Sequence, residues 1–145
     1  MNHEIIKKTE EIITAKADFN GGFEGYATLT LIDEAGYPTS STLSVVKADG
    51  IKWLTFISAL SANPAKRIEK CNRACVCINS SEHHISLVGT VEVFADKKTK
   101  KIMWQEVFAG YYNGPEDPDL CVLRFHTEHY NLYFIDGDLE AKGAL

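Results

Sequence analysis

The sequence lacks any long hydrophobic run. No apolar stretch approaches the roughly 20 residues that a membrane-spanning helix needs, so we expect no membrane segment. The N-terminal residues, with Glu4, Lys7 and Lys8 among them, also lack the apolar centre of a secretion signal. We therefore expect the protein to stay in the cytoplasm.

The sequence also lacks an excess of positive charge. Its 15 Lys and Arg residues are outnumbered by 20 Asp and Glu residues, and the formal net charge is -5. Nucleic-acid binding depends on clustered cations that neutralise phosphates, so this balance argues against a nucleic-acid partner. The one dense basic run, residues 97–101, is interpreted as the solvated face of a helix.

Familiar catalytic and nucleotide-binding motifs are missing as well. The sequence contains no G-x-S-x-G nucleophile turn, no G-x-G-x-x-G and no G-x-x-x-x-G-K-[ST]. His83 and His84 precede a predicted strand without a third partner at metal-ligand spacing, so we predict no metal site there. No catalytic residue is assigned from these patterns.

Cysteine is scarce, and its spacing fits no common metal motif. The four residues are Cys71, Cys75, Cys77 and Cys121, and C-x3-C-x-C matches neither zinc pairs nor the usual iron–sulfur runs. We favour buried thiols without a ligand, which stay reduced in the cytoplasm, and keep a metal site and redox chemistry as alternatives. Cys75 and Cys77 are two apart in a predicted strand and therefore share one face.

The 145 residues are enough for one domain spanning 1–145 with a single core, and 45% of them are hydrophobic. An amphipathic helix is predicted over residues 2–16, and Asp18 to Gly22 should break it. The predicted strands span residues 26–32, 39–47, 51–57, 74–78, 85–94, 120–125 and 130–135.

Turn and cap residues punctuate this pattern. Asp49-Gly50 predicts a hairpin, and Gly89 predicts a bulge within the longest strand. One short helix should begin with Asn63 as N-cap and Pro64 in its first turn, and should end near residue 72. A second should begin at Asp96 and run through Trp104 toward Phe108, before a loop over 111–118 and a polar tail from Asp136. Seven short strands with few helices predict a mainly-β barrel or sandwich.

Two segments carry polar groups that suit a ligand. The first is the predicted helix start, where Ser61 and Asn63 precede Lys66 and Arg67; a helix N-terminus accepts anions, although a capped helix with two solvated cations explains the segment equally simply. The second is the strand over 39–44, whose hydroxyl groups occur on both faces. That strand either binds a polar ligand or is an edge strand facing water.

The order of these segments resembles the pyridoxamine 5'-phosphate oxidase-like group of flavin-binding split barrels, especially its short general-stress-protein branch. The similarity runs from the N-terminal helix to about residue 136. It rests on residues 38–47 before the Asp49-Gly50 hairpin, on 53–72, on 84–96 and on 104–118 with its Gly-Pro-Glu-Asp-Pro-Asp loop. This resemblance implies a six- to seven-stranded antiparallel split barrel of the FMN-binding type, with an N-terminal helix and two short helices.

The resemblance also implies where a flavin mononucleotide (FMN) would bind. The second strand and the turn into the short helix would hold the phosphate. The edge of the ring would contact main-chain groups of the strand before that turn. A polar residue that opens the longest strand would also touch the ring. The partner subunit would add one aromatic from the second helix and one near the last strand. The matching residues in this sequence are Ser41, Thr42, Ser61, Lys66 and Arg67 for the phosphate, Phe56, Ile57, Ser58 and His84 for the ring, and Trp104 and Tyr130 from the partner.

The match departs from the family at two expected cations. The family often carries Arg where this chain has Ser41, and Ser-x-Lys at the turn where this chain reads Ser61-Ala62-Asn63; Lys66 and Arg67, one helical turn later, are the replacements. The chain also lacks the C-terminal arginine region of the true pyridoxine-phosphate oxidases, so that activity is not expected. The resemblance implies a homodimeric FMN protein, an oxidoreductase for an unidentified small substrate and electron donor, or alternatively a non-enzymatic flavin-binding, small-ligand-binding or stress-related dimer.

Overall fold

The structure is a computed structural model that describes residues 2–17 and 25–145, so the predicted break from Asp18 to Gly22 lies outside the described residues. The predicted N-terminal helix is present as α1, Asn2–Ala17. Its Ile5 and Ile13 are buried, as the amphipathic pattern predicts. The Glu10 carboxylate accepts a hydrogen bond from the Ile51 amide at 3.1 Å, and this bond ties the helix to a sheet turn.

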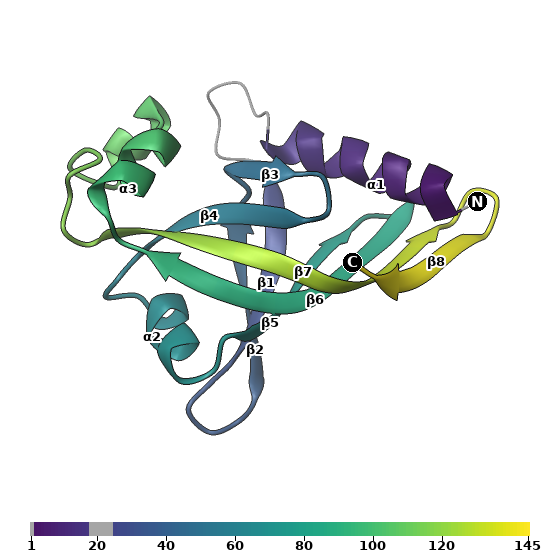
Figure 1. The fold of residues 1–145 in the computed structure, drawn as a ribbon, viewed down its shortest axis with the longest axis horizontal. Coiled ribbons are helices and arrows are strands. Elements are labelled where there is room, and N and C mark those ends of the chain that lie inside the picture. The colour runs from purple at the N-terminus through teal and green to yellow at the C-terminus, as the bar shows by residue number, and fades with distance from the viewer. Residues whose placement is uncertain (1, 18–24) are drawn as a thin grey trace.

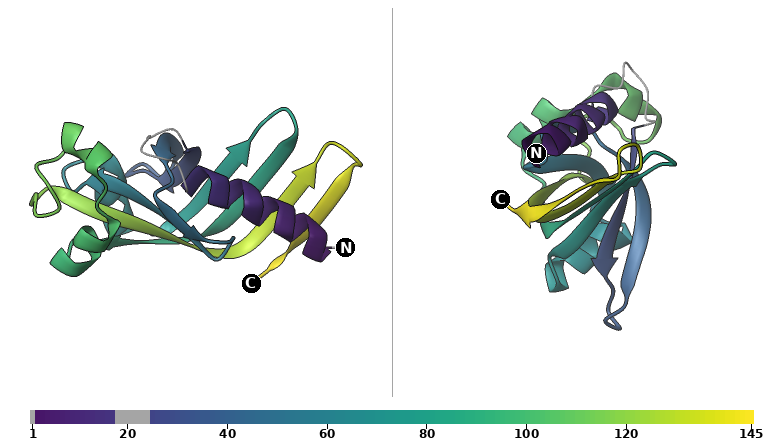
Figure 2. Two further views of the ribbon diagram at one scale, coloured as in Figure 1. Left: turned by 90° about the horizontal axis from the view of Figure 1, so that it is seen from above. Right: turned by 90° about the vertical axis from the view of Figure 1, so that its right-hand side faces the viewer.

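The described residues form eight antiparallel strands in one curled sheet (Figures 1 and 2). The strand order is β2-β1-β5-β6-β7-β4-β3, and β8 pairs with β7 beside this path. The strands are β1 Tyr26–Ile32, β2 Pro38–Ser44, β3 Lys47–Asp49, β4 Trp53–Ala59, β5 Arg73–Asn79, β6 His83–Phe94, β7 Leu120–Phe134 and β8 Leu139–Ala144. The mainly-β, antiparallel architecture predicted from the sequence is confirmed.

The last third of the chain differs most from the sequence prediction. The two predicted strands over 120–125 and 130–135 are one strand, β7, and the predicted polar tail contains β8. A turn joins β7 to β8, and its Gly137 and Asp138 have φ values of 81° and 48°. The sequence contains no strand signal for β8, because only Ala141 of this strand is buried and its other residues are exposed or half-exposed.

The helices on the connections follow local signals with two corrections. The second short helix, α3 Lys97–Met103, begins after Asp96, whose side chain accepts a hydrogen bond from the Thr99 amide at 2.9 Å. It ends before Trp104 instead of continuing toward Phe108, and a 3-10 turn, η1 Glu106–Gly110, follows. The first, α2 Asn63–Lys70, has Pro64 in its first turn, but Ala62 is the N-cap and no side chain caps it. The prediction of Asn63 as N-cap is therefore wrong.

The described residues form two apolar clusters, which lie on opposite sides of the sheet. The larger one fills the curl of the barrel with residues such as Leu29, Phe56 and Phe125, and α1 and α2 close it. The smaller one lies between the outer face of β4 and β7 and the α3–η1 segment, where Ile57 and Phe108 are buried. Among the described helices, none is long and apolar enough to cross a membrane.

The irregularity predicted at Gly89 is present, but the extra residue is in β7: Val88 pairs with His129 and Gly89 with Thr127, which leaves Glu128 unpaired. The β6–β7 register shifts between Val88 and Gly89, so the two longest strands bend together at this point. A Cβ atom on Gly89 would collide with the carbonyl oxygen of His126 on β7. A main-chain atom of a central strand cannot move aside cheaply, so glycine is required here.

Gly89→Ala should therefore lower the free energy of unfolding by about 2–3 kcal/mol, in the range for overpacked sites. Urea denaturation monitored by circular dichroism would measure the change. Gly110→Ala is the matched control, because a Cβ atom there meets nothing within 4 Å. Equal effects of the two substitutions would contradict a steric role for Gly89.

Candidate functional site

A cavity of about 320 Å³ opens where the two ends of the curled sheet approach each other. The strands on its two sides are β2, at one end of the strand order, and β4, next to the other end. We call this cavity the seam cavity. Its lining residues are Tyr26, Thr42, Leu43, Ser44, Ile57, Tyr111 and Tyr112. Two residues predicted as flavin contacts, Thr42 and Ile57, thus meet at one cavity with the tyrosines of the predicted 111–118 loop.

The main chain of β4 contributes an open edge beside this cavity. On one side β4 pairs with β7 from Trp53 to Ala59, whereas β3 pairs only with Trp53 to Thr55 on the other side. Beyond Thr55, the described strands leave the second edge of β4 without a ladder partner. Phe56 points into the barrel core, and Ile57 and Ser58 are also buried. Their predicted role through main-chain groups, not side chains, is compatible with this placement.

The loop that carries Tyr111 and Tyr112 is fixed by the Asp117 residue. Its carboxylate accepts the amides of Asn113 and Asp119, each at 2.9 Å, and these hydrogen bonds lower the pKa of the carboxyl group. The carbonyl oxygen of Asp117 accepts a 2.7 Å hydrogen bond from the Lys100 ammonium. Burial raises the pKa of the Tyr112 hydroxyl, so this side chain stays neutral at the cavity wall.

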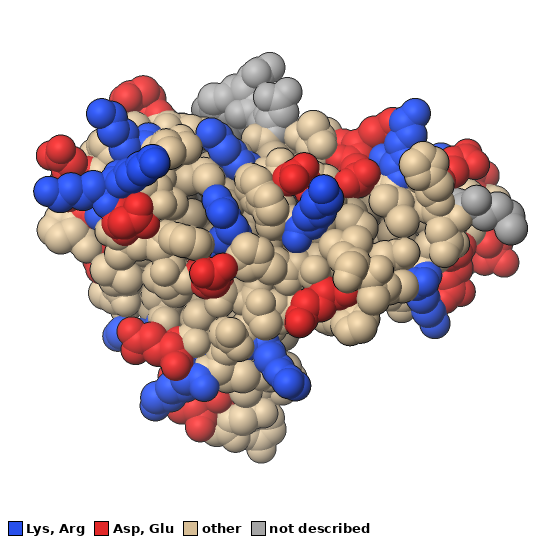
Figure 3. All heavy atoms as spheres, viewed as in Figure 1, with Lys and Arg blue, Asp and Glu red and all other residues tan. Residues whose placement is uncertain are grey.

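Lys100 corrects the interpretation of the basic run. Lys97, Lys98 and Lys101 are exposed on α3, as a solvated helix face requires, but Lys100 is only 5% exposed and reaches under the loop. In Figure 3, basic and acidic side chains are mixed over the α3 end of the molecule, as they are over the rest of this face. The sequence pattern did not distinguish Lys100, because its partner is a carbonyl group 17 residues away.

Ser61, at the turn into α2, is bonded to a carboxylate. The Asp119 side chain accepts the Ser61 amide at 2.9 Å and the Ser61 hydroxyl at 2.7 Å. Lys66 is exposed one turn along α2, and Arg67 is half-buried. The Nε atom of Arg67 is buried without a hydrogen-bond partner among the described residues. The turn thus already binds a carboxylate, that of Asp119, and the short helix that follows carries the unpaired Nε donor of Arg67.

Strand alternation separates the two residues predicted on β2. Ser41 pairs with Leu29, whose side chain is in the barrel core, whereas Thr42 pairs with Thr28 and points to the outer face. Thr42 therefore lines the seam cavity and Ser41 does not. Trp104 lies near that cavity, because it belongs to the cluster that contains Ile57 and Tyr112 and packs edge-to-face on Phe108 at 5.7 Å.

His84 and Tyr130 do not line the seam cavity. His84 is the second residue of β6 and stacks on Tyr133 at 6.0 Å between ring centres, while Tyr130 packs between the barrel core and Gly143 of β8. Within one chain the structure does not bring these two residues to Thr42 and Ile57. Their assignment to a flavin site stays a prediction.

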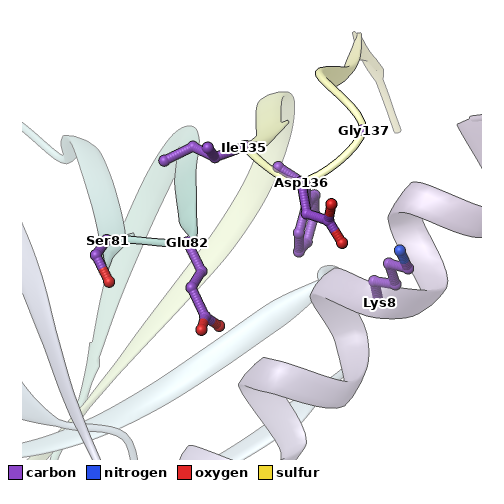
Figure 4. Close-up of a pocket in the computed structure, with 7 residues that line it drawn as sticks. Lys8, Ser81, Glu82, Ile135, Asp136 and Gly137 are labelled. Atoms are coloured by element: carbon purple, nitrogen blue, oxygen red, sulfur yellow. The ribbon is translucent and has the colours of Figure 1, made fainter.

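A larger, open hollow of about 720 Å³ lies at this same end, between α1 and the tips of two hairpins (Figure 4). Its polar lining includes Lys8, Glu82 and Asp136, and its aromatic residue, Phe134, already has the Lys8 ammonium over its ring at 5.8 Å. Figure 4 shows Lys8 reaching from α1 toward the tip that carries Asp136. The seam cavity, with two tyrosines and an open strand edge, is better suited to a flat aromatic ligand.

Fold and cavity together define a split β-barrel with a small-molecule cavity at its open seam. The chain belongs to the pyridoxamine 5'-phosphate oxidase-like family, whose model matches residues 15–134. No curated protein matches the chain.

Solved structures share the fold of this chain. A Clostridium acetobutylicum protein related to general stress protein 26 has a TM-score of 0.83 at 22% identity, over 100% of this chain and 97% of that one. A pyridoxamine 5'-phosphate oxidase-related, FMN-binding protein from Nostoc punctiforme has a TM-score of 0.67 at 14% identity, over 99% and 94%. A heme-binding protein from Mycobacterium smegmatis has a TM-score of 0.69 at 16% identity, over 94% and 57%.

The tether from Lys100 yields a test of loop order. Lys100→Met keeps the apolar stem but removes the hydrogen bond to Asp117, so we expect about 1 kcal/mol less protection of the loop, or about fivefold faster amide exchange over residues 113–119. Hydrogen exchange followed by mass spectrometry would measure it. Lys101→Met, an exposed neighbour, should leave exchange unchanged; the same acceleration in both variants would contradict a specific tether.

Proposed function

We propose that the protein binds FMN with the flavin ring at the seam cavity and acts, as a cytoplasmic homodimer, as an oxidoreductase on a small substrate. The seam cavity is the observation that carries this proposal, because it joins an open strand edge, a hydroxyl group and two tyrosines. One structurally similar protein of the same family is an FMN-binding protein. That similarity supports the cofactor assignment without fixing the reaction.

The ring end of the ligand fits the residues at the cavity. A flat heteroaromatic ring stacks favourably on aromatic side chains, and Tyr111 is 74% exposed at the cavity mouth. The ladder-free edge of β4 over Phe56 to Ser58 offers main-chain groups for the polar rim of a flavin. Bound FMN would supply the electron transfer, whereas the chain would bind it, orient it and limit access by water.

The phosphate end fits the turn at Ser61 in part. The Asp119 carboxylate stands where an oxyanion accepts the Ser61 amide and hydroxyl, so these donors suit a phosphate oxygen. The unpaired Nε of Arg67 and the exposed ammonium of Lys66 would add the charge that Ser41 and Asn63 do not carry. Asp119 itself would compete with a phosphate, because two anions at one turn repel each other.

The direct experiment is a titration of the purified protein with FMN, followed through the visible absorption and fluorescence of the flavin. We expect saturable binding with one FMN per chain. Reduction by nicotinamide cofactors, with a panel of acceptors, would then separate an oxidoreductase from a binding protein. Absence of FMN binding, or binding of haem in its place, would contradict the proposal; haem has its own absorption spectrum.

Charge changes at the turn should affect FMN and spare riboflavin, which lacks the phosphate. Replacing Lys66 and Arg67 together by Ala should weaken FMN binding by about 10- to 100-fold, since a charge-assisted hydrogen bond contributes about 1.5–3 kcal/mol. Asp119→Asn should have the opposite sign and strengthen FMN binding by about fivefold, because an exposed repulsion is worth about 1 kcal/mol. Equal changes for FMN and riboflavin would place the phosphate elsewhere.

The homodimer is proposed because one chain leaves part of the predicted site incomplete. His84 and Tyr130 do not line the seam cavity of their own chain, so we assign their contacts with a flavin to a second copy. Light scattering should give the mass of a dimer, and Tyr130→Phe should leave that mass unchanged. Tyr130→Ala should lower flavin affinity about tenfold, the scale of one stacked aromatic pair. A monomer that binds FMN with full affinity would contradict the shared site.

A further inference from the structure

Cys75 and Cys77 form a thiol pair on the outer face of the sheet, where Thr28 lies between Cys77 and Thr42 of the seam cavity; neither cysteine lines that cavity. Their Sγ atoms are 3.6 Å apart, and the Ser86 hydroxyl lies 3.7 Å from the Cys75 sulfur. Both side chains are half-buried, whereas Cys121 is fully buried. The sequence prediction that the two thiols share one face is confirmed, but the preference for buried cysteines is wrong for all except Cys121.

The backbone holds this pair rigidly. Strand β5 lies inside the sheet and is paired along both edges, with β1 and with β6. The residues that alternate with the cysteines, Val76 and Ile78, are buried in the barrel core and anchor the strand on its inner face. The two sulfurs are therefore kept side by side without a loop that must first become ordered.

The protonation states of the two thiols differ. The Cys77 thiol donates to the Cys75 sulfur, and this hydrogen bond, helped by Ser86, lowers the pKa of Cys75 to about 6. The same interaction raises the pKa of Cys77. The register neighbours are Thr30 and Val88 beside Cys75 and Thr28 and Ser86 beside Cys77, and none carries a charge. Near pH 7 the pair is one thiolate and one thiol.

The sulfur separation selects the kind of centre that the pair can hold. Two sulfurs bonded to one centre at about 2.3 Å lie about 3.4 Å apart at the bond angle of about 95° of a pyramidal centre, and about 3.8 Å apart at a tetrahedral angle. The observed 3.6 Å lies between these values, whereas a linear centre requires about 4.6 Å. No group of three or more His, Cys, Asp or Glu side chains is arranged for a metal ion within residues 2–17 and 25–145. Among the described residues the site thus offers two sulfur ligands, placed for a centre with a bent S–centre–S angle, and no third ligand.

We propose that Cys75 and Cys77 are a dithiol site that captures monosubstituted trivalent arsenicals. Such a centre is pyramidal, carries one organic group and needs two further ligands, which matches the two available sulfurs. With phenylarsine oxide, the As=O double bond breaks and two As–S bonds form. The proton of the Cys77 thiol and one proton from solvent leave with the oxygen as one water molecule, and arsenic stays trivalent, so no oxidant or reductant is required.

The test uses the reduced full-length protein and phenylarsine oxide, with adducts counted by intact-mass spectrometry. One adduct should survive excess 2-mercaptoethanol and be removed by 2,3-dimercaptopropanol, because only a chelate resists a monothiol. Cys75→Ser and Cys77→Ser should each lower the affinity at least about 100-fold, the loss expected when a second attachment is removed. Circular dichroism would confirm that each variant is folded.

Cys71→Ser is the matched control, since Cys71 is also half-buried but lies outside the pair. It should retain the monothiol-resistant adduct in full. Absence of that adduct from the wild type would overturn the proposal, as would its persistence in either single variant of the pair or its loss in Cys71→Ser. None of these readouts involves flavin, so the dithiol site stands or fails independently of the proposed function.

A second measurement tests the ionisation of Cys75 separately from the binding of arsenic by both sulfurs. Alkylation of Cys75 by iodoacetamide should rise with pH through a midpoint near the pKa of about 6. In Cys77→Ala the donor is lost and the midpoint should move upward, while Cys77→Ser keeps a hydroxyl donor and should move it less. Neither variant should chelate. An unshifted midpoint in Cys77→Ala would show that the two sulfurs do not interact.

Discussion

The pairing of β7 with three other strands is the constraint on which the fold depends. Among the described strands, only β7 pairs with three others: β6 along most of its length, β4 over its first half and β8 over its second half. One strand has two edges, so a third partner requires that β4 and β8 share one edge at different levels. The register shift between Val88 and Gly89 lets β6 and β7 bend between these two levels. Without that bend, the barrel end and the β8 end would lie in one flat sheet.

The seam cavity follows from the same arrangement. Strands β1 and β2 attach to β7 through β5 and β6, whereas β4 attaches directly, so the two arms curl toward each other and leave an open seam. The start of β7 also fixes the ligand-side loops. Asp119, just before Leu120, accepts both donors of Ser61, and Asp117 binds Asn113, Asp119 and Lys100. The turn into α2 and the tyrosine loop are thus held at one point of the sheet.

Local signals made much of this fold predictable, but long-range contacts did not. Asp96 as N-cap, Pro64 in a first turn and Gly89 at a bulge each satisfy a requirement of their own backbone segment, so the sequence reveals them. Thr42 and Ile57 reached the site prediction through family resemblance. Asp119 and Lys100 were missed, because their partners lie 58 and 17 residues away and nothing local marks them. The Asp-Pro-Asp sequence at 117–119 indicates only a loop, although both carboxylates organise it.

Alternation along strands explains why one sheet offers two chemically different sites. On β2 it turns Thr42 toward the seam cavity and Ser41 toward the core, so the two adjacent hydroxyl groups lie on opposite faces of the strand. On β5 it buries Val76 and Ile78 and leaves Cys75 and Cys77 together on the outer face. A strand that anchors itself by alternate apolar residues therefore presents the residues between them at fixed separations. Where those residues are thiols, the sheet supplies the preorganisation that a flexible pair of cysteines would lose in entropy on binding.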